Sequence, residues 1–444
     1  MFAVARHAGQ HIVVKEEGRC KVHTRRTHVA ELVQHHRADL SFQQACYQWL
    51  HAHPELSGQE ANTAATIAEY LERFDCEITR NIGGHGLVAV FRNGKGPTVL
   101  FRADFDGLPV EEITGVPFAS QEVAIGKDGN PTKVMHACGH DMHTTAALGA
   151  CAILDEHRAD WHGTVVMLFQ PAEEDSTGAA AMVADGLQDI IPAPDVCLGQ
   201  HIVPGPAGQV MTMPGAALAA CDSVTITIFG QSAHGSMPHH SIDPTVVAAM
   251  IILRLQTIVA REISPEDFAV ISVGTLQSGH TNNTIPGTAT LTLNCRFYDD
   301  AVKATVYAAI ERVVRAECVA SGCVQEPTFS WFAHGELTDN DETVFSAVRP
   351  VFDALFGQDS VTATRWTASE DFPFIPQAFG APYLFWTVGV TPRPQWHAAA
   401  AQGQLEQVIP GNHMGTFLPD YEPSVQACTQ AAAAAILTYV ANPQ

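Results

Sequence analysis

The sequence predicts an α/β protein with a mostly parallel sheet and a smaller domain inserted into the chain. Two observations lead to this fold class. Over most of the 444 residues, short apolar runs alternate with helical patterns, as in a parallel sheet covered by helices. Over residues 222–331 the strands instead alternate polar and apolar side chains, and the first pattern resumes afterwards. We therefore expect one discontinuous domain and one inserted domain.

The main domain is expected to contain the following helices and strands in chain order. A first helix is predicted near Ser57, because Ser57-Gly58-Gln59-Glu60 matches a capping box. Buried strands are predicted at four apolar runs, residues 98–101, 164–169, 196–198 and 383–386. Helices are predicted at residues 144–156 and 179–187 and at the alanine-rich stretch around 430–435.

The inserted segment has the order of a ferredoxin-like domain. A helix is expected to begin at Asp243-Pro244, with Asp243 as its N-cap, and a second helix is expected to end at Gly322. Strands are predicted at residues 224–229, 268–276, 288–297 and 324–331. The resulting β-α-β-β-α-β order is that of the ferredoxin-like arrangement. We expect three parts of the chain: an N-terminal extension (1–29), the main domain (30–217 and 334–444) and the inserted domain (218–333).

Charge and cysteine content restrict the partners and the compartment. The chain has 24 Lys and Arg against 47 Asp and Glu, a net charge of −23. Because nucleic acids and anionic membranes bind to basic surfaces, we expect neither of them as a partner of this protein. Eleven cysteines without paired spacing predict no disulfide framework, and so a reducing cytoplasm. No run reaches the ~18 apolar residues of a membrane span. Residues 1–26 lack an apolar signal core and are expected to form a loosely ordered extension.

Two short segments carry side chains of the kinds that bind metals. Residues 136–143, HACGHDMH, offer a thiol, three imidazoles and a carboxylate, and residues 170–175, QPAEED, offer three consecutive carboxylates. A single buried Cys or His is usually structural, but packing does not require this many polar residues just before an apolar helix. Gly139 is expected to form a tight turn that brings Cys138 and His140 to one centre.

The adjacent acids Glu173 and Glu174 suggest a division of labour. In extended backbone, neighbouring side chains point in opposite directions, so one carboxylate can bind a metal while the other takes a proton from an attacking water. Their position alone does not show which residue does which. A solvated acidic loop is the competing interpretation, and the buried strand and Pro171 that precede the acids argue against it.

Polar side chains follow three of the predicted strands. The first strand is followed by Asp104 and Asp106, the second by the two glutamates and the third by His201. Ligands of open α/β sheets bind at the carboxyl ends of the strands, so these residues are expected to meet at one edge. His413, in a glycine-flanked loop, and His234, in the inserted domain, are weaker candidates. The remaining histidines are expected to be surface or structural residues: His51, His53, His157, His162, His239, His240, His334 and His397.

Seven segments together resemble the M20 metallopeptidase family, in particular its amidohydrolase branch of aminoacylases, hippurate hydrolases and auxin-conjugate hydrolases. The resemblance extends from about residue 40 to 435. The segments that carry it are RADFDGLP (102–109), HACGHDMH (136–143), QPAEE (170–174), GQH (199–201), SAHGSMPH (232–239), SEDF (369–372) and GNH (411–413).

The resemblance implies a function for each of the candidate residues. It makes Glu173 the general base and Asp106 the acid that supports a ligand. It places His234 of the inserted lid on the substrate carbonyl or carboxylate, often across a dimer, and Asn283 and Arg296 on a substrate carboxylate. The family usually has His-x-Asp after its first strand, where this chain has Asp104, so the part played by Asp104 stays open. The implied ligands of a two-metal centre are Cys138, His140, Glu174, His201 and His413.

The implied activity is hydrolysis of N-acyl amino acids by a homodimer or higher homo-oligomer with two divalent metal ions per subunit. The cysteine favours zinc, while imidazole and carboxylate ligands leave manganese, cobalt and nickel open. Within the family, a dipeptidase or an aminobenzoyl-glutamate-type hydrolase is the nearest alternative. A cysteine hydrolase based on Cys138 would leave both glutamates without a task, and a catalytically silent metal-binding protein would not need Glu173.

Overall fold

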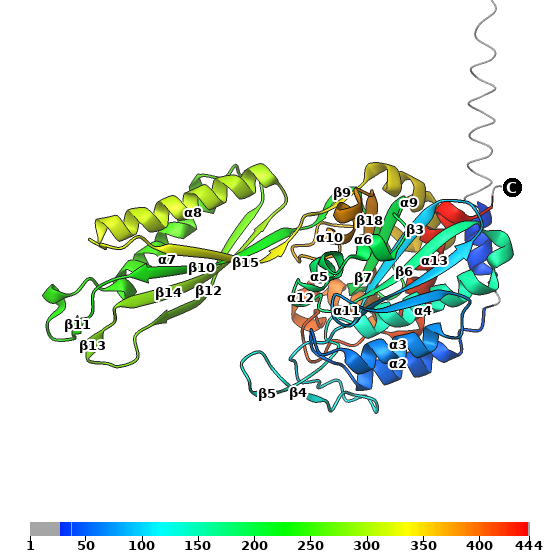
Figure 1. The fold of residues 1–444 in the computed structure, drawn as a ribbon, viewed down its shortest axis with the longest axis horizontal. Coiled ribbons are helices and arrows are strands. Elements are labelled where there is room, and N and C mark those ends of the chain that lie inside the picture. The colour runs from blue at the N-terminus through cyan, green and yellow to red at the C-terminus, as the bar shows by residue number, and fades with distance from the viewer. Residues whose placement is uncertain (1–26, 37, 443–444) are drawn as a thin grey trace, which may run out of the picture. The chain divides into compact units, whose positions relative to one another are not determined.

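The structure, a computed structural model, describes residues 27–36 and 38–442 (Figure 1). Most of the expected N-terminal extension, residues 1–26, lies outside the described residues. The chain forms two compact units. The second unit consists of Ala216–Asp339 and Arg365–Pro373, and the rest of the described chain forms the first unit. The chain therefore returns to the first unit twice, at Asn340 and at Phe374.

The first unit is built on an eight-stranded mixed sheet with the strand order β1-β2-β6-β3-β7-β18-β8-β17. The four central strands, β6 to β18 in this order, pair in parallel, which confirms the mostly parallel core and all four predicted strands. The strands are β1 (Glu77–Ile82), β2 (Gly86–Asn93), β3 (Thr98–Asp104), β6 (Gly163–Gln170), β7 (Val196–Pro206), β8 (Val210–Thr212), β17 (Ser360–Thr362) and β18 (Tyr383–Thr391).

Two helices at the centre of the first unit are buried over most of their length. Helix α4 (His140–Glu156) packs against α2 (Phe42–Ala52), α3 (Ala61–Leu71) and α13 (Tyr421–Val440). The run of buried alanines in α13 confirms the predicted C-terminal helix, and small side chains allow close packing. The other helices of this unit are α5 (Gly178–Ala184), α6 (Leu187–Ile190), α9 (Glu342–Phe356), α10 (Phe374–Phe379), α11 (Arg393–Ala401) and α12 (Leu405–Val408).

The predicted capping box at Ser57 is wrong. Helix α3 begins at Ala61, and its N-cap Glu60 makes no capping hydrogen bond. The Ser57 hydroxyl instead donates to Asp106 Oδ2 at 2.7 Å. Glu60 is fully buried and accepts from the backbone N–H groups of Gly58 and Ala172, at 2.8 and 2.9 Å. Both side chains therefore connect this loop to segments that lie near Glu173.

The second unit contains a four-stranded antiparallel sheet with the order β12-β14-β10-β15 and two long helices. The inward side chains of β10 alternate with more exposed ones, and both helices contribute to the same apolar core. Asp243 caps the first helix by accepting from the Thr245 N–H at 2.9 Å, as predicted. The elements are β10 (Ala220–Phe229), α7 (Pro244–Arg261), β12 (Ala269–Ser278), β14 (Thr288–Phe297), α8 (Asp300–Ala320) and β15 (Thr328–Gly335).

Two details of the second unit differ from the predicted pattern. The last strand begins at Thr328, and Val324, where it was predicted to begin, is 94% exposed. Two short strands, β11 (Ala233–His234) and β13 (Thr284–Ile285), form an additional ribbon. Within the described part of the chain, α7 alone is long and apolar enough to cross a membrane by length and composition, and its apolar face forms part of the core of this unit.

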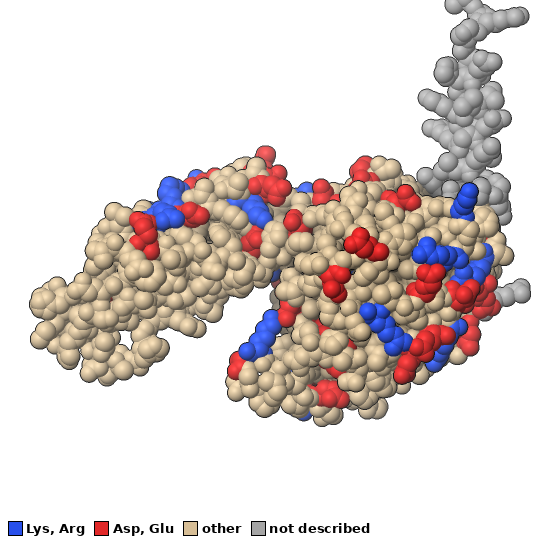
Figure 2. Space-filling view, viewed as in Figure 1, with Lys and Arg blue, Asp and Glu red and all other residues tan. Residues whose placement is uncertain are grey.

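Acidic and basic side chains are interspersed on the face of the molecule shown in Figure 2. Exposed ion pairs of the first unit include Arg80 with Glu72 at 2.6 Å and Arg92 with Glu77 at 3.2 Å. Such exposed pairs contribute about 0–1 kcal/mol to stability, so the core rather than the surface holds the first unit together.

Candidate metal centre

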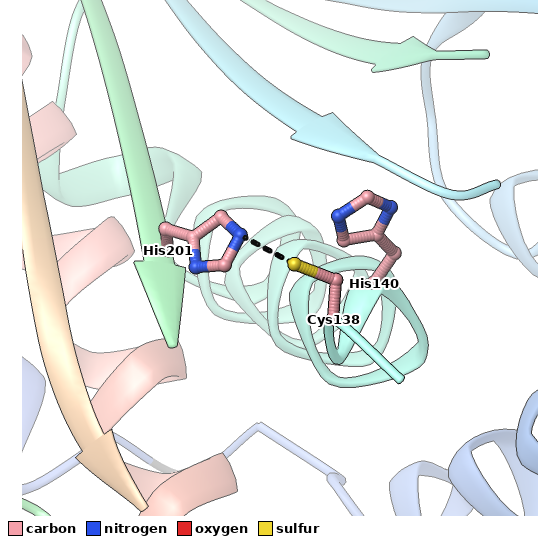
Figure 3. A group of neighbouring side chains, drawn as sticks. All are labelled: Cys138, His140 and His201. Atoms are coloured by element: carbon pink, nitrogen blue, oxygen red, sulfur yellow. Dashed lines mark hydrogen bonds between the residues drawn. The ribbon is translucent and has the colours of Figure 1, made fainter. Parts of the chain in front are cut away.

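The turn before α4 places a thiol and an imidazole next to each other. Gly139 has φ +83°, and a Cβ atom at this position would lie 2.2 Å from Ile202 Cδ1. Only glycine fits here without strain and a clash, which confirms the predicted tight turn. Figure 3 shows the Cys138 sulfur between the rings of His140 and His201. The distance from Cys138 Sγ to His201 Nε2 is 3.4 Å.

His201 lies inside β7 and not at its end, contrary to the prediction. Strand β7 continues to Pro206, and its parallel register with β3, which pairs Arg102 with Gly199, places His201 level with Asp104, the last residue of that neighbour. The Ile202 carbonyl accepts from His201 Nδ1 at 2.7 Å, which directs Nε2 towards Cys138. Burial and the adjacent His143 hold the pKa of His201 well below its usual value, so its imidazole is neutral.

Asp106 holds the ring of His140 in place. Its Oδ1 lies 3.1 Å from His140 Nδ1, while its Oδ2 accepts from Ser57 Oγ and from the backbone N–H of Glu174 at 3.0 Å. With Nδ1 occupied in this way, Nε2 of His140 faces the other candidate ligands. A carboxylate partner of this kind orients and strengthens a ligating imidazole.

Asp104, whose part the sequence left open, belongs to a buried charged network. Its carboxylate lies 2.5 Å from Arg102 Nη1 and 2.5 Å from His143 Nδ1, and Oδ2 is 3.7 Å from His140 Nε2. Burial would raise the pKa of Asp104, but the Arg102 charge and the two histidines hold it well below its usual value. Asp104 is therefore a permanent negative charge beside His140.

Glu173 and Glu174 do not point in opposite directions. The Oε2 of Glu173 and the Oε1 of Glu174 both lie 3.8 Å from His140 Nε2. The expectation assumed extended backbone, whereas Ala172 has φ +50° and the chain turns, with the Ser176 N–H donating to the Glu173 carbonyl at 2.7 Å. The turn brings both carboxylates to the same imidazole.

His413 reaches this group from a loop that is distant in sequence. Its Nε2 lies 3.3 Å from Glu174 Oε2, and its backbone N–H donates to the Ala137 carbonyl at 2.8 Å. The neighbouring Asn412 amide donates to the Ile202 carbonyl at 3.1 Å. The loop is therefore anchored directly beside the turn that carries Cys138. His413 itself has φ +67°, so the local backbone is held in the left-handed region.

The structure brings the five expected ligands and Glu173 together. Their donor atoms form overlapping groups in which all atoms lie within 4.8 Å of one another. Two buried atoms of the group, His140 Nε2 and Glu174 Oε1, have no hydrogen-bond partner, although an unpaired buried polar atom costs about 1–3 kcal/mol. Burial raises the pKa of Glu174 to about 8, even though the nearby His140 opposes the shift. These features are typical of donors that await a cation.

The three expected residues of the inserted domain do not form one cluster. His234 is exposed and pairs with Thr284, next to Asn283, in the β11–β13 ribbon. Arg296 lies near the far end of β14, where it donates to Asn294 Oδ1 and Ser369 Oγ, both at 3.0 Å. Strand β14 begins at Thr288, close in sequence to the ribbon, and Arg296 lies near its other end. At ~3.3 Å per residue, the distance along the strand between these two residues is roughly 25 Å.

The sequence did not reveal two residues that support the centre, Ser57 and Glu60. Both were interpreted as helix-capping residues, and their actual partners lie in distant segments. His51, expected to be surface or structural, is 1% exposed and lies between Asp141 Oδ2 at 2.7 Å and Glu112 Oε1 at 3.0 Å. No local sequence pattern marks the contacts of these three residues.

Known proteins are similar to this chain over most of its length. The family model "Peptidase family M20/M25/M40" matches residues 100–413. An N-acetylcysteine deacetylase of Bacillus subtilis is 34% identical over 354 residues, which cover 79% of this chain and 89% of the relative. A hippurate hydrolase of Campylobacter jejuni is 33% identical over 340 residues, covering 76% of this chain and 85% of the relative.

A solved structure extends the similarity to the fold. A crystal structure of a Bacillus subtilis protein, described as a dinuclear metal binding peptidase from the M20 family, matches with a TM-score of 0.70 and 28% identity. The match covers 90% of this chain and 98% of that protein. Because the family model matches more than half of the chain, and a relative is 34% identical over 89% of its own length, the chain belongs to peptidase family M20/M25/M40.

Proposed function

We propose that this protein is a metal-dependent amidohydrolase that cleaves N-acyl amino acids to a carboxylate and a free amino acid. The observation that carries the proposal is the group of one thiol, three imidazoles and two carboxylates at the edge of the parallel sheet, of which His413 alone is exposed. Relatives named N-acetylcysteine deacetylase, hippurate hydrolase and N-acyl-L-amino acid amidohydrolase support this substrate class.

The donor set fits divalent metal ions. Cys138, His140, Glu174, His201 and His413 would hold two ions, and the partnerless His140 Nε2 and Glu174 Oε1 are the donors that such ions would engage. The thiolate favours zinc, while the imidazoles and the carboxylate suit manganese, cobalt or nickel as well. The dinuclear centre named for the related Bacillus subtilis structure supports a count of two.

The protein side chains would divide the reaction among them. When bound, the two ions supply Lewis-acid polarisation of the amide carbonyl and activation of water. Glu173, 8% exposed and 3.8 Å from His140 Nε2, accepts the proton of the attacking water and passes it to the leaving nitrogen. Asp106 keeps His140 oriented throughout.

We also propose that the second unit is a ferredoxin-like lid and dimerisation domain. His234 would donate to the developing oxyanion, and Asn283 and Arg296 would hold the substrate carboxylate. Because roughly 25 Å of strand separates Arg296 from the other two, one copy of this unit cannot present all three to one small substrate. Two copies in a homodimer can, with the ribbon of one subunit and the arginine of the other at each site.

The compartment proposed for the enzyme is a reducing cytoplasm. The ten cysteines among the described residues are free thiols, and most of them are buried. A chain of this size that folds around free thiols is typical of a compartment that keeps cysteine reduced.

Removal of metal tests the proposed function. Prolonged chelation should abolish hydrolysis of N-acetyl and N-benzoyl amino acids, and Zn²⁺, Mn²⁺, Co²⁺ or Ni²⁺ should restore it. Full activity in a preparation that elemental analysis shows to be metal-free would contradict the proposal and favour Cys138 as a nucleophile. Including dipeptides and aminobenzoyl-glutamate among the substrates distinguishes the two alternatives within the family, since either would then be the preferred substrate.

A further inference from the structure

A cavity of about 560 Å³ lies beside the candidate metal centre, entirely within the first unit. One wall is the loop before α3, with Leu56 and Ser57, and another is the segment after β3, with Leu108. A hairpin of β4 (Val123–Ile125) and β5 (Pro131–Lys133) forms a third wall through its turn and through Thr132. The volume lies in the range of small-molecule sites, ~300–1,000 Å³.

Two of the side chains that line the cavity connect it to the metal centre. Glu174, a proposed ligand, lines the cavity directly. Ser57 lines it as well, and its hydroxyl donates to Asp106, which in turn holds His140 at 3.1 Å. A substrate whose reacting bond lies at the metal centre could therefore place one of its substituents in this cavity.

The hairpin is tied to both neighbouring walls. Gln59 Nε2 donates to the Ile125 carbonyl at 3.1 Å, which joins β4 to the loop before α3. Lys127, in the hairpin turn, lies 2.5 Å from Asp175, the residue after Glu174. These two contacts hold the hairpin in place as a wall of the cavity.

The charges of the lining disfavour an anionic occupant. Among the described residues that line the cavity, Lys127 is the one with a positive charge, and Asp175 already neutralises it. Asp128 adds a negative charge. The remaining wall is largely apolar and includes Leu56, Leu108, Pro109 and Pro131. An uncharged, apolar group gains most from such a surface.

We infer that this cavity receives the acyl group of the substrate and that Thr132 helps to determine which acyl groups are accepted. The inference rests on the proposed function, because it divides an N-acyl amino acid into an uncharged acyl end and an anionic carboxylate end. The lining suits the first end and repels the second. Uncharged acyl groups larger than acetyl, such as pentanoyl and benzoyl, are therefore preferred to acyl groups that carry a carboxylate.

A charge introduced at Thr132 tests the assignment. N-pentanoyl and N-glutaryl derivatives of one amino acid have acyl chains of the same length and differ in a terminal carboxylate. In the metal-loaded full-length enzyme, Thr132→Arg should raise the glutaryl-to-pentanoyl ratio of kcat/KM by about tenfold or more. Val123→Arg is the matched control, because Val123 lies on the same hairpin, is 55% exposed and does not line the cavity, so it should leave the ratio unchanged.

A change of volume provides a second, independent variant. Thr132→Trp should lower the benzoyl-to-acetyl ratio of kcat/KM by about tenfold, and Val123→Trp should not. Unchanged ratios in both Thr132 variants would overturn the acyl assignment, as would a changed preference among amino acids at a constant acyl group. Failure of the metal-loaded wild-type enzyme to hydrolyse any N-acyl amino acid would overturn the proposed function itself.

Discussion

At the scale of single residues, Glu173 and Glu174 lie equally close to the same imidazole nitrogen and are assigned different tasks. Glu174 also contacts His413 at 3.3 Å and has an oxygen without a hydrogen-bond partner, which favours it as the ligand. Glu173 is then left as the base, as the resemblance to the family implies. The distances to His140 alone would not separate the two.

Substitution of each glutamate by glutamine separates their tasks. Glu173→Gln should retain both metal ions and lose turnover by a factor on the order of 10² or more, since only the proton acceptor is removed. Glu174→Gln should lose metal affinity as well, because a ligating charge is removed. Elemental analysis and kcat measured on the same preparations check both statements. Equal metal content in both variants, with an active Glu173→Gln, would show that the assignment is wrong.

The candidate site could be predicted from the sequence where its residues lie in compact motifs. Cys138, His140, Glu173 and Glu174 lie in two short segments, so their chemistry was visible before their geometry. Ser57 and Glu60 were misinterpreted, because a serine and a glutamate three residues apart also match a helix cap. Their actual partners, Asp106 and the backbone of Ala172, are brought near only by the folded sheet.

At the scale of elements, the turn between Cys138 and α4 determines where two ligands point. Gly139→Ala places a Cβ 2.2 Å from Ile202 Cδ1 in addition to the backbone strain of φ +83°. Gly115→Ala is a matched control, because Gly115 has φ +77° with nothing within 4 Å of the added Cβ. The control should lose roughly 1–2 kcal/mol of stability and keep its metal.

Gly139→Ala should in addition lose metal affinity and turnover, because the turn that carries Cys138 and His140 must shift away from the buried Ile202. Isothermal titration with Zn²⁺ and steady-state kinetics on both variants measure the difference. If Gly139→Ala bound metal as tightly as Gly115→Ala, the turn would not be what positions the ligands.

A buried charged triad joins α2 to α4 and should make stability depend on pH. Burial opposes the charge on His51, but the hydrogen bonds that its ring donates to Asp141 and Glu112 raise its pKa to about 10. The rings of Tyr47 and Phe118 also pack against the ring of His51. Because the folded-state pKa is raised, the stabilisation is complete below the unfolded value of ~6.5, declines above it and is lost as the pH passes about 10.

Denaturant unfolding of the wild type and of His51→Gln from pH 6 to 11 tests this dependence. The difference in unfolding free energy between the two proteins should be largest near pH 6 and shrink towards pH 10, since other titrating groups affect both proteins alike. A difference that stayed constant over this range would mean that His51 does not titrate with the raised pKa.

The elements that could be predicted from the sequence are those with a regular apolar pattern or clear signals at their ends. The central strands are continuous apolar runs, and the helices of the second unit have clear N- and C-terminal signals. Helix α2 was missed because its buried face includes Gln43 and His51, which obscure the apolar repeat. Strand β7 was predicted too short because it continues past His201 into a loop-like sequence with two prolines.

At the scale of the whole molecule, His234 should act in the subunit next to its own. His234→Ala should fold and bind metal normally while kcat falls by ~10²–10³, as for loss of one oxyanion donor. Mixing it in equal amounts with Glu173→Gln should recover roughly a quarter of the wild-type activity, because half of the dimers then contain one intact site. Each variant incubated alone is the control.

Two outcomes would contradict these expectations in different ways. A wild-type kcat in His234→Ala would remove this residue from the reaction. Loss of activity without recovery on mixing, in dimers shown to exchange subunits, would place His234 in the site of its own subunit. Analytical ultracentrifugation establishes the oligomeric state on which the mixing experiment depends.

The strand order of the first unit also determines when this unit can complete its folding during translation. Strand β18 pairs with β7, and α13 packs against both, yet these segments are translated after the whole second unit. The sheet of the second unit is complete once β15 has emerged. The earlier half of the first unit, in contrast, keeps apolar surface exposed until β18 and α13 have been translated, and such a state is prone to aggregation. Because His413 follows β18, a nascent chain acquires its full set of metal donors only when translation is nearly finished.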